Sequence, residues 1–154
     1  MDLSSILRPA AVKVLANTSS KKRLFQDLGD IVDGCYGLDS AGAFAALQAR
    51  ETLGPTGVGH GVALPHARLT GIDNVVGAFI RLEKPLEFEA VDRQPVDIAC
   101  ALFAPEDAGV DHLKALALVS RTLRDSAVCT KLRANRNPAT LYTILTSAES
   151  DQAA

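Results

Sequence analysis

Residues 57–68 of the chain read Gly57-Val58-Gly59-His60-Gly61-Val62-Ala63-Leu64-Pro65-His66-Ala67-Arg68. Three alternating glycines lead into a short apolar strand, and that strand ends at a proline that is followed at once by a histidine. Glycine N–H groups are not shielded by side chains, so they can bind an anion. We therefore expect His66 at a sheet edge or loop mouth, next to an anion cradle made by the glycines. This combination indicates chemistry on phosphate.

The glycine run does not match the common nucleotide-binding motifs. It lacks the Gly-Lys-Ser/Thr that completes a P-loop. Its Gly-x-Gly-x-Gly spacing runs from a helix into a strand, whereas the Rossmann fingerprint runs from a strand into a helix. The sequence therefore predicts neither bound ATP nor bound NAD. Taken alone, the glycines also fit a plain tight turn.

Length and composition are those of an ordinary globular protein. The 154 residues, 47% of them hydrophobic and 22% charged, fit one domain over residues 1–154. A net charge of -2 argues against a nucleic-acid partner. No segment approaches the roughly 20 apolar residues of a membrane span, and no signal sequence opens the chain, so we expect a cytoplasmic protein. Cys35, Cys100 and Cys129 lack metal-ligand spacing, which predicts reduced thiols in or near the core.

Strand and helix patterns alternate along the chain. Strands are expected at residues 11–16, 62–64, 74–82 and 95–103, with a shorter one at 86–90 before a turn at Asp92-Arg93. A first helix is expected from a cap at Ser19 or Ser20 to Gly34 or Gly37. A second is expected to start at a cap at Asp39 or Ser40, with Phe44, Leu47 and Leu53 on its buried side. A third is expected from a cap at Asp111 to Arg124, followed by two more helical pieces that reach Thr146. Residues 6–146 form the expected ordered core, and 147–154 a frayed polar tail. The predicted architecture is a single α/β (α+β) domain, a mixed central sheet flanked by helices on both sides.

Residues 51–67 resemble the active-site signature of the mannitol/fructose-type enzyme IIA (EIIA) proteins of the bacterial phosphotransferase system. That signature has an acidic or amide residue, six free positions, an aliphatic residue, Gly or Ala, two free positions, and then aliphatic-Ala-aliphatic-Pro-His-small. It is met here by Glu51, Val58, Gly59, Val62, Ala63, Leu64, Pro65, His66 and Ala67. The rest of the chain agrees from about Ile6 to Thr146.

Further segments are similar to the nitrogen-regulatory branch of that family, often called EIIA-Ntr or PtsN. They are the run at 82–88, the segment Gln94-Pro95-Val96-Asp97, and the helix at 112–119. Two positions depart from the pattern. His60 stands where close relatives often have Asn, and Ala99-Cys100 replaces bulkier apolar residues.

The resemblance implies that His66 accepts a phosphoryl group from a phosphohistidine on a small carrier protein, HPr or its nitrogen-branch paralogue NPr. An imidazole with the ordinary histidine pKa of about 6.5 is often neutral near pH 7, and its bare nitrogen is a nucleophile. Catalysis of phosphoryl transfer is mostly positioning and charge stabilisation. The charge stabilisation is expected to come from the groups of a phosphate loop, which are Thr56, Gly57, Gly59, His60 and Gly61. No metal ion or cofactor is expected, because donor and acceptor are both histidines.

Two residues outside the loop are further candidates. His112 follows the expected cap Asp111 at a helix N-terminus, where partial positive charge favours anions and disfavours an imidazolium. In relatives, a histidine at this place faces the reactive one and contacts the phosphoryl group. Arg50 matches a family arginine near the active site and could pair with phosphate oxygens. The alternatives are a surface histidine and a solvated helix-end arginine.

Other functions stay open on the sequence. His60, His66 and His112 could form a three-histidine zinc site, although their spacing is typical of no zinc motif. The chain could also be a pure binding module. In the resembled branch, the phosphorylation state controls partners such as potassium-transport proteins and sensor kinases. Transport EIIA proteins instead pass the phosphoryl group to a sugar-specific EIIB domain. We expect regulation, because neither an EIIB domain nor a membrane segment follows.

Overall fold

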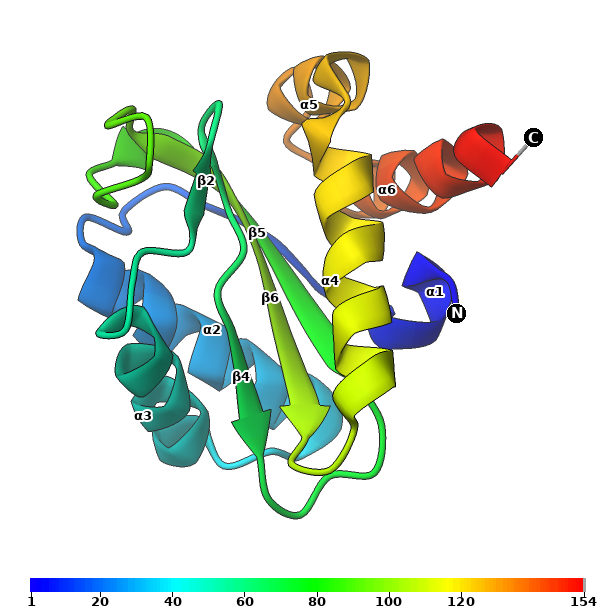
Figure 1. Ribbon diagram of the computed structural model, residues 1–154. Coiled ribbons are helices and arrows are strands. Elements are labelled where there is room, and N and C mark those ends of the chain that lie inside the picture. The colour runs from blue at the N-terminus through cyan, green and yellow to red at the C-terminus, as the bar shows by residue number, and fades with distance from the viewer. Residues whose placement is uncertain (154) are drawn as a thin grey trace.

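The computed structural model describes residues 1–153, and the side chains of residues 1–147. Figure 1 shows a central sheet between two groups of helices. The strands are β1 (Leu7–Leu15), β2 (Gly57–Gly59), β3 (Val62–Ala63), β4 (His66–Leu69), β5 (Val76–Leu86) and β6 (Val96–Pro105). The helices are α1 (Leu3–Ile6), α2 (Lys21–Tyr36), α3 (Ser40–Glu51), α4 (Gly109–Arg124), α5 (Ser126–Arg133) and α6 (Pro138–Ala153). None of the described helices is long and apolar enough to cross a membrane.

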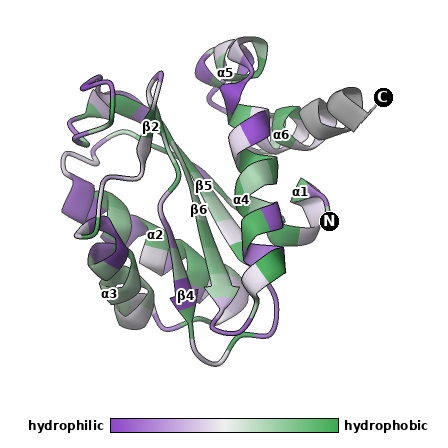
Figure 2. Cartoon of the chain, in the orientation of Figure 1, coloured by the Kyte–Doolittle hydropathy of each residue, from purple (hydrophilic) through white to green (hydrophobic). Residues whose placement is uncertain are grey.

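The sheet is mixed, and its order is β1-β5-β6-β3-β2, with β4 also beside β6. The central pair β5 and β6 runs antiparallel, while β1 pairs in parallel with β5, and β3 and β4 pair in parallel with β6. Almost every residue of β6 is buried, as expected for a strand covered on both faces. Figure 2 shows the same hydrophobic colouring along β5 and β6. The predicted mixed sheet and its two apolar central strands are confirmed.

Helices α2 and α3 begin where their capping residues predict, and α2 ends at a predicted glycine. The side chain of Ser20 accepts a hydrogen bond from the Arg23 N–H, and that of Asp39 accepts one from the Gly42 N–H. Gly37, with φ 72°, ends α2 in the left-handed conformation that glycine adopts readily. Both helices lie on one side of the sheet, and α4, α5 and α6 lie on the other (Figure 1).

Two expectations about helix ends are wrong. Leu53 was expected on the buried side of α3, but it lies beyond the end of that helix and is 82% exposed. Asp111 was expected as the cap of α4, but the N-cap is Ala108, and Asp111 lies in the first turn, where its charge still complements the helix dipole. The backbone of α6 continues to Ala153, and the frayed tail from Ser147 stays an expectation. Ala154 lies outside the described residues.

Three expectations about strands also need correction. β1 begins at Leu7, earlier than the expected residue 11. No strand forms at 86–90, because β5 continues through Leu86 and the next residues have no regular structure. Glu89 has φ 58°, which an extended strand does not allow. The glycine run is not an open loop, since Gly57–Gly59 forms a strand that pairs antiparallel with β3.

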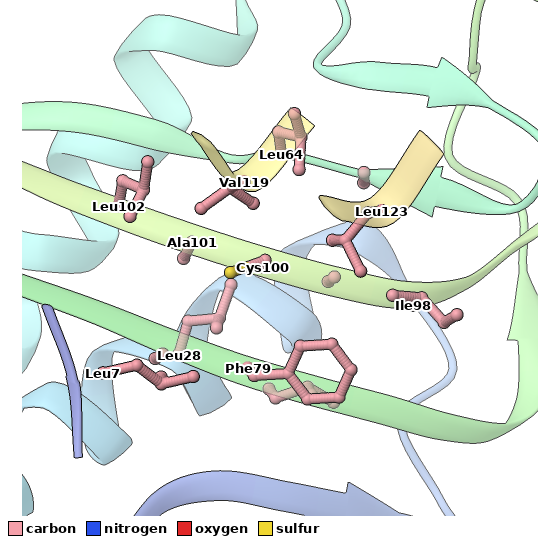
Figure 3. Packing of buried hydrophobic residues seen from close by; sticks show 14 of the residues in the cluster. Leu7, Leu28, Leu64, Phe79, Ile98, Cys100, Ala101, Leu102, Val119 and Leu123 are labelled. Carbon is pink, nitrogen blue, oxygen red and sulfur yellow. The ribbon is translucent and has the colours of Figure 1, made fainter. Parts of the chain in front are cut away.

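The core fills the space between the sheet and the helices on both of its sides. Figure 3 shows Leu28 of α2 and the pair Val119 and Leu123 of α4 packed with side chains of β5 and β6. Cys100 and Cys129 are buried free thiols, as expected, while Cys35 is half-buried. Burial raises the pKa of the Cys100 thiol to about 12, so it stays protonated at neutral pH.

Candidate functional site

His66 lies where one edge of the sheet is interrupted. β3 ends at Ala63, and His66 is the first residue of β4, so it begins a strand as well as following one. Pro65 has no N–H to donate, but its carbonyl accepts a hydrogen bond from the Leu102 N–H of β6 at 3.0 Å. Pairing with β6 therefore resumes at once, and His66 lies at the edge of the sheet, which is one of the two positions expected for it. Its side chain is half-buried.

The ring of His66 has a defined tautomer. Its Nδ1 lies 2.8 Å from the backbone carbonyl oxygen of Leu64. A carbonyl oxygen can only accept a hydrogen bond, so Nδ1 carries the proton. In the neutral ring Nε2 is then the bare nitrogen, and it is the atom able to act as a nucleophile.

His112 faces His66 from the first turn of α4. The two ring centroids are 5.5 Å apart, with an angle of 70° between the planes. His112 is only 7% exposed, and this burial is the main cause that lowers its pKa below the ordinary value. The charges of the nearby His66 and Arg68 lower the pKa of His112 further. Its ring is therefore neutral at pH 7. The Nε2 atom is buried without a hydrogen-bond partner. An unpaired buried polar atom costs about 1–3 kcal/mol, so it calls for a functional explanation.

Arg50 lies in the last turn of α3, a helix that packs against β4. Its Nη1 donates to the carbonyl oxygen of Gly54 at 3.0 Å, which closes the loop after the helix. Within the described part of the chain, no acidic side chain pairs with this half-buried guanidinium. The hydrogen bond of Arg50 to Gly54 closes a loop, and the packing of α3 against β4 places this helix next to the strand that begins at His66.

The residues expected to form a phosphate loop have other partners. The N–H and hydroxyl of Thr56 both donate to the carboxylate of Glu51, at 3.1 and 2.6 Å. The His60 N–H donates to Asp92 at 2.9 Å, and the His60 carbonyl accepts from Arg133 at 2.7 Å. His60 N–H and the neighbouring Gln94 N–H lower the pKa of Asp92.

The turn itself lies away from His66. Gly59, His60 and Gly61 all have positive φ, at 103°, 56° and 78°, and they form the tip of the β2–β3 hairpin. In Figure 1 this tip points to the top of the molecule, while β4, which begins at His66, runs the other way. Gly59, His60 and Gly61 therefore build a tight hairpin turn. For the same reason, His60 does not join His66 and His112 in a zinc site, and the described residues contain no cluster of three or more potential metal ligands.

Reasoning from sequence missed an ion pair that closes this hairpin. Arg133 of α5 donates through Nε and Nη2 to Asp97 of β6, at distances of 2.9 to 3.1 Å, and the same Nη2 donates to His60. The signal in the sequence was a single acidic residue, Asp97, inside an otherwise apolar strand. Its basic partner is 36 positions away, and no local pattern indicates it.

Comparisons with known proteins agree with the fold and the motif. The family described as phosphoenolpyruvate-dependent sugar phosphotransferase system, EIIA 2, matches residues 5–148. The nitrogen regulatory protein of Bradyrhizobium diazoefficiens is 41% identical over 145 residues, which are 94% of this chain and 95% of that protein. The nitrogen regulatory protein of Escherichia coli K12 is 37% identical over 150 residues, 97% of this chain and 92% of that one.

Solved structures give the same answer. The crystal structure of nitrogen regulatory protein IIA-Ntr from Neisseria meningitidis matches with a TM-score of 0.85 at 36% identity, covering 93% of this chain and 98% of that chain. The mannitol IIA of Escherichia coli matches with a TM-score of 0.72 at 18% identity, covering 88% and 96%, which shows a shared fold alone. With a family match over nearly its whole length and relatives of this similarity, the chain belongs to the EIIA type 2 family of the phosphoenolpyruvate-dependent sugar phosphotransferase system.

Proposed function

We propose that this chain is a single-domain regulatory EIIA protein of the cytoplasm, in which His66 accepts a phosphoryl group at Nε2 from the phosphohistidine of HPr or NPr. The observation that carries the proposal is the bond from His66 Nδ1 to the Leu64 carbonyl, which leaves Nε2 bare in a ring that faces His112, whose own Nε2 is unpaired. Family membership supports phosphoryl transfer between proteins.

The proposed step is a direct transfer between two imidazoles. The lone pair of His66 Nε2 forms a bond to phosphorus as the bond from phosphorus to the carrier's ring nitrogen breaks, and the electron pair of that bond stays on the carrier. His66 keeps its proton on Nδ1, and the Leu64 carbonyl still accepts it. Such a step depends on alignment and on stabilising the charge of the phosphoryl oxygens. No residue has to add or remove a proton.

His112 supplies the stabilising donor in this proposal. Its lowered pKa keeps the ring neutral, with a proton on one nitrogen only. In the tautomer with the proton on Nε2, that otherwise unpaired atom donates to a phosphoryl oxygen on His66. Removing one preorganised donor of this kind typically slows a reaction by about 10²–10³. Arg50 adds positive charge from the end of α3.

The surface beside the two histidines fits a protein partner. Val110 and Leu113, on the first turns of α4 on either side of His112, are 65% and 68% exposed. An exposed apolar patch next to a reactive group is typical of a docking surface. Phosphorylation adds about −1.5 to −2 charge to such a surface, and a partner that buries it must desolvate that charge. We therefore expect regulatory partners to prefer the unphosphorylated form.

Relatives named nitrogen regulatory protein favour regulation of proteins, with potassium-transport proteins and sensor kinases as the expected classes of partner. A second candidate function is sugar transport through an EIIB domain. A fructose-specific EIIA component of Haloferax volcanii is 30% identical over 145 residues, and mannitol IIA of Escherichia coli forms a complex with phosphorylated mannitol IIB. Fast transfer to a sugar-specific EIIB domain, with equal affinity of both phosphorylation states for all captured partners, would favour that candidate.

The decisive experiment is phosphorylation of the purified chain by phosphoenolpyruvate, enzyme I and either carrier. One acid-labile phosphoryl group should be added, and His66→Ala should add none. His60→Ala is the matched control, because it removes the other histidine of the same motif, and it should be labelled like the wild type. Label that persists in His66→Ala, or that survives acid, contradicts the proposal. Affinities of both states for captured partners should then differ by tenfold or more, which is about 1.4 kcal/mol.

A further inference from the structure

Glu51 is the last residue of α3, and its carboxylate is nearly out of contact with water. The side chain is only 8% exposed, and Lys21 Nζ lies 2.9 Å from Oε1. The same Oε1 accepts the Thr56 N–H at 3.1 Å, and Oε2 accepts the Thr56 hydroxyl at 2.6 Å. Lys21 also lies over the Phe88 ring, 4.4 Å from its centroid. Burying a carboxylate is costly unless it is paired and hydrogen-bonded, and this one is both.

The residue that Glu51 fixes is connected to the ring of His66. The carbonyl of Thr56 accepts a hydrogen bond from the Leu64 N–H at 2.9 Å. The carbonyl of the same Leu64 accepts the proton of His66 Nδ1 at 2.8 Å. Hydrogen bonds joined through the backbones of Thr56 and Leu64 thus connect the carboxylate to the imidazole.

The backbone around His66 gives this chain of bonds its importance. Leu64 and Pro65 lie between β3 and β4, where the regular pairing of the sheet edge is interrupted. The Leu64 N–H bonds to the Thr56 carbonyl and not to β6, so Thr56 holds the peptide group that precedes Leu64. Thr56 is in turn only 4% exposed, which leaves it little freedom to find another acceptor.

We propose that Glu51 is a positioning residue for phosphoryl transfer, which sets the tautomer of His66 from a distance. It fixes Thr56, Thr56 fixes Leu64, and the Leu64 carbonyl keeps the proton on Nδ1 and the lone pair on Nε2. The consequence for transfer rests on the proposed function, whereas the consequence for the tautomer does not. Without Glu51, His66 distributes its proton over both nitrogens, and part of the phosphoryl group is accepted at Nδ1.

The test measures the ring tautomer of His66 by nitrogen NMR in the unphosphorylated protein at a pH where the ring is neutral. Glu51→Ala removes the anchor, and Glu51→Asp keeps the charge but is one methylene too short to hold both Thr56 bonds. Glu51→Gln keeps the length and an acceptor oxygen. Asp97→Asn is the control, since it weakens a half-buried ion pair at the far end of the hairpin. Phosphoryl transfer and the phosphorylated ring nitrogen are measured on the same samples.

We expect wild type, Glu51→Gln and Asp97→Asn to carry the proton on Nδ1. Glu51→Ala and Glu51→Asp should show a mixture, transfer on the order of 10- to 100-fold slower, and part of the label on Nδ1. If Glu51→Ala fails to fold, Glu51→Asp decides. An unchanged tautomer in the folded variants overturns the inference, even where their stability falls. A wild type that accepts no phosphoryl group refutes the proposed function instead, and the tautomer comparison still tests Glu51.

Discussion

The two ends of β3 carry histidines of the same glycine-rich motif in opposite environments. At the hairpin tip, the backbone of His60 is bound on both sides, by Asp92 and Arg133, while the side chain is exposed. At the sheet edge, the side chain of His66 is bound by the Leu64 carbonyl, and its ring faces His112. One histidine thus serves through its main chain and the other through its ring. Being in the motif does not by itself place a residue in the site.

Packing alone explains two of the glycines in the motif. A Cβ on Gly57 would lie 2.6 Å from the Ala90 Cβ, and one on Gly61 would lie 2.6 Å from Arg133 Nη2. Both are closer than real Cβ contacts, and Gly61 also has a positive φ of 78°. The glycines therefore let the hairpin pack closely against the 90s loop and against α5. This packing fixes the direction in which the chain leaves β3 towards His66.

The first way to test the comparison is to remove the ring that faces His66. His112→Ala should still accept one phosphoryl group, but about 10²–10³ times more slowly, because a preorganised donor is lost. Single-turnover transfer from a phosphorylated carrier measures this rate. His60→Ala, treated in parallel, should transfer at the wild-type rate. Equal rates for all of these proteins would make His112 a packing residue and remove the distinction between the two ends.

A second test adds a methyl group at the close contact of the hairpin. Gly57→Ala should destabilise the fold by about 1–3 kcal/mol, because overpacking against Ala90 forces the backbone to shift. Urea unfolding followed by circular dichroism measures the change. Gly109→Ala is a suitable control, since nothing lies within 4 Å of its added Cβ. A Gly57→Ala protein as stable as that control would show that the close approach of residue 57 to Ala90 is not required for stability.

Sequence reasoning predicted the parts of the molecule that rest on local chemistry. Ser20 and Asp39 cap their helices, and the apolar run of β6 is central, because capping and burial patterns are written in neighbouring residues. The cap at Asp111 failed because Ala108 begins the helix without a side-chain bond.

The site also contains features that local sequence predicts and features that it does not. The motif and the helix N-terminus indicated His66 and His112, and the fold brings the two rings together. The roles of Glu51 and Arg133 depend on partners in other elements, which no local pattern specifies. The phosphate-binding role of the glycine run stays a prediction, because glycine frequency alone does not distinguish a cradle from a hairpin turn.

A third test uses pH, because the burial of His112 has a thermodynamic consequence. Its pKa in the folded protein lies below the ordinary 6.5 of an exposed histidine. As pH falls through 6.5, the unfolded chain takes up a proton that the folded protein does not, so the free energy of unfolding decreases until the folded pKa is reached. The slope is at most about 1.4 kcal/mol per pH unit. His112→Leu should lose this slope, which unfolding midpoints at pH 7.5, 6.5 and 5.5 measure. If the unfolding midpoints of the wild type and His112→Leu change with pH in parallel, the prediction for His112 is contradicted.

The smallest expected effect belongs to the other end of β3. His60 has φ 56°, a conformation in which Asn is at least as common as His. His60→Asn keeps the backbone N–H for Asp92 and the carbonyl for Arg133, so the free energy of unfolding should change by no more than about 0.5 kcal/mol. The rate of phosphoryl transfer should not change, since the exposed ring takes no part in it. Asp92→Ala, which removes the acceptor of that N–H, should destabilise more than His60→Asn does. A tenfold slower phosphoryl transfer in His60→Asn, at an unchanged free energy of unfolding, would show that the hairpin tip takes part in the reaction.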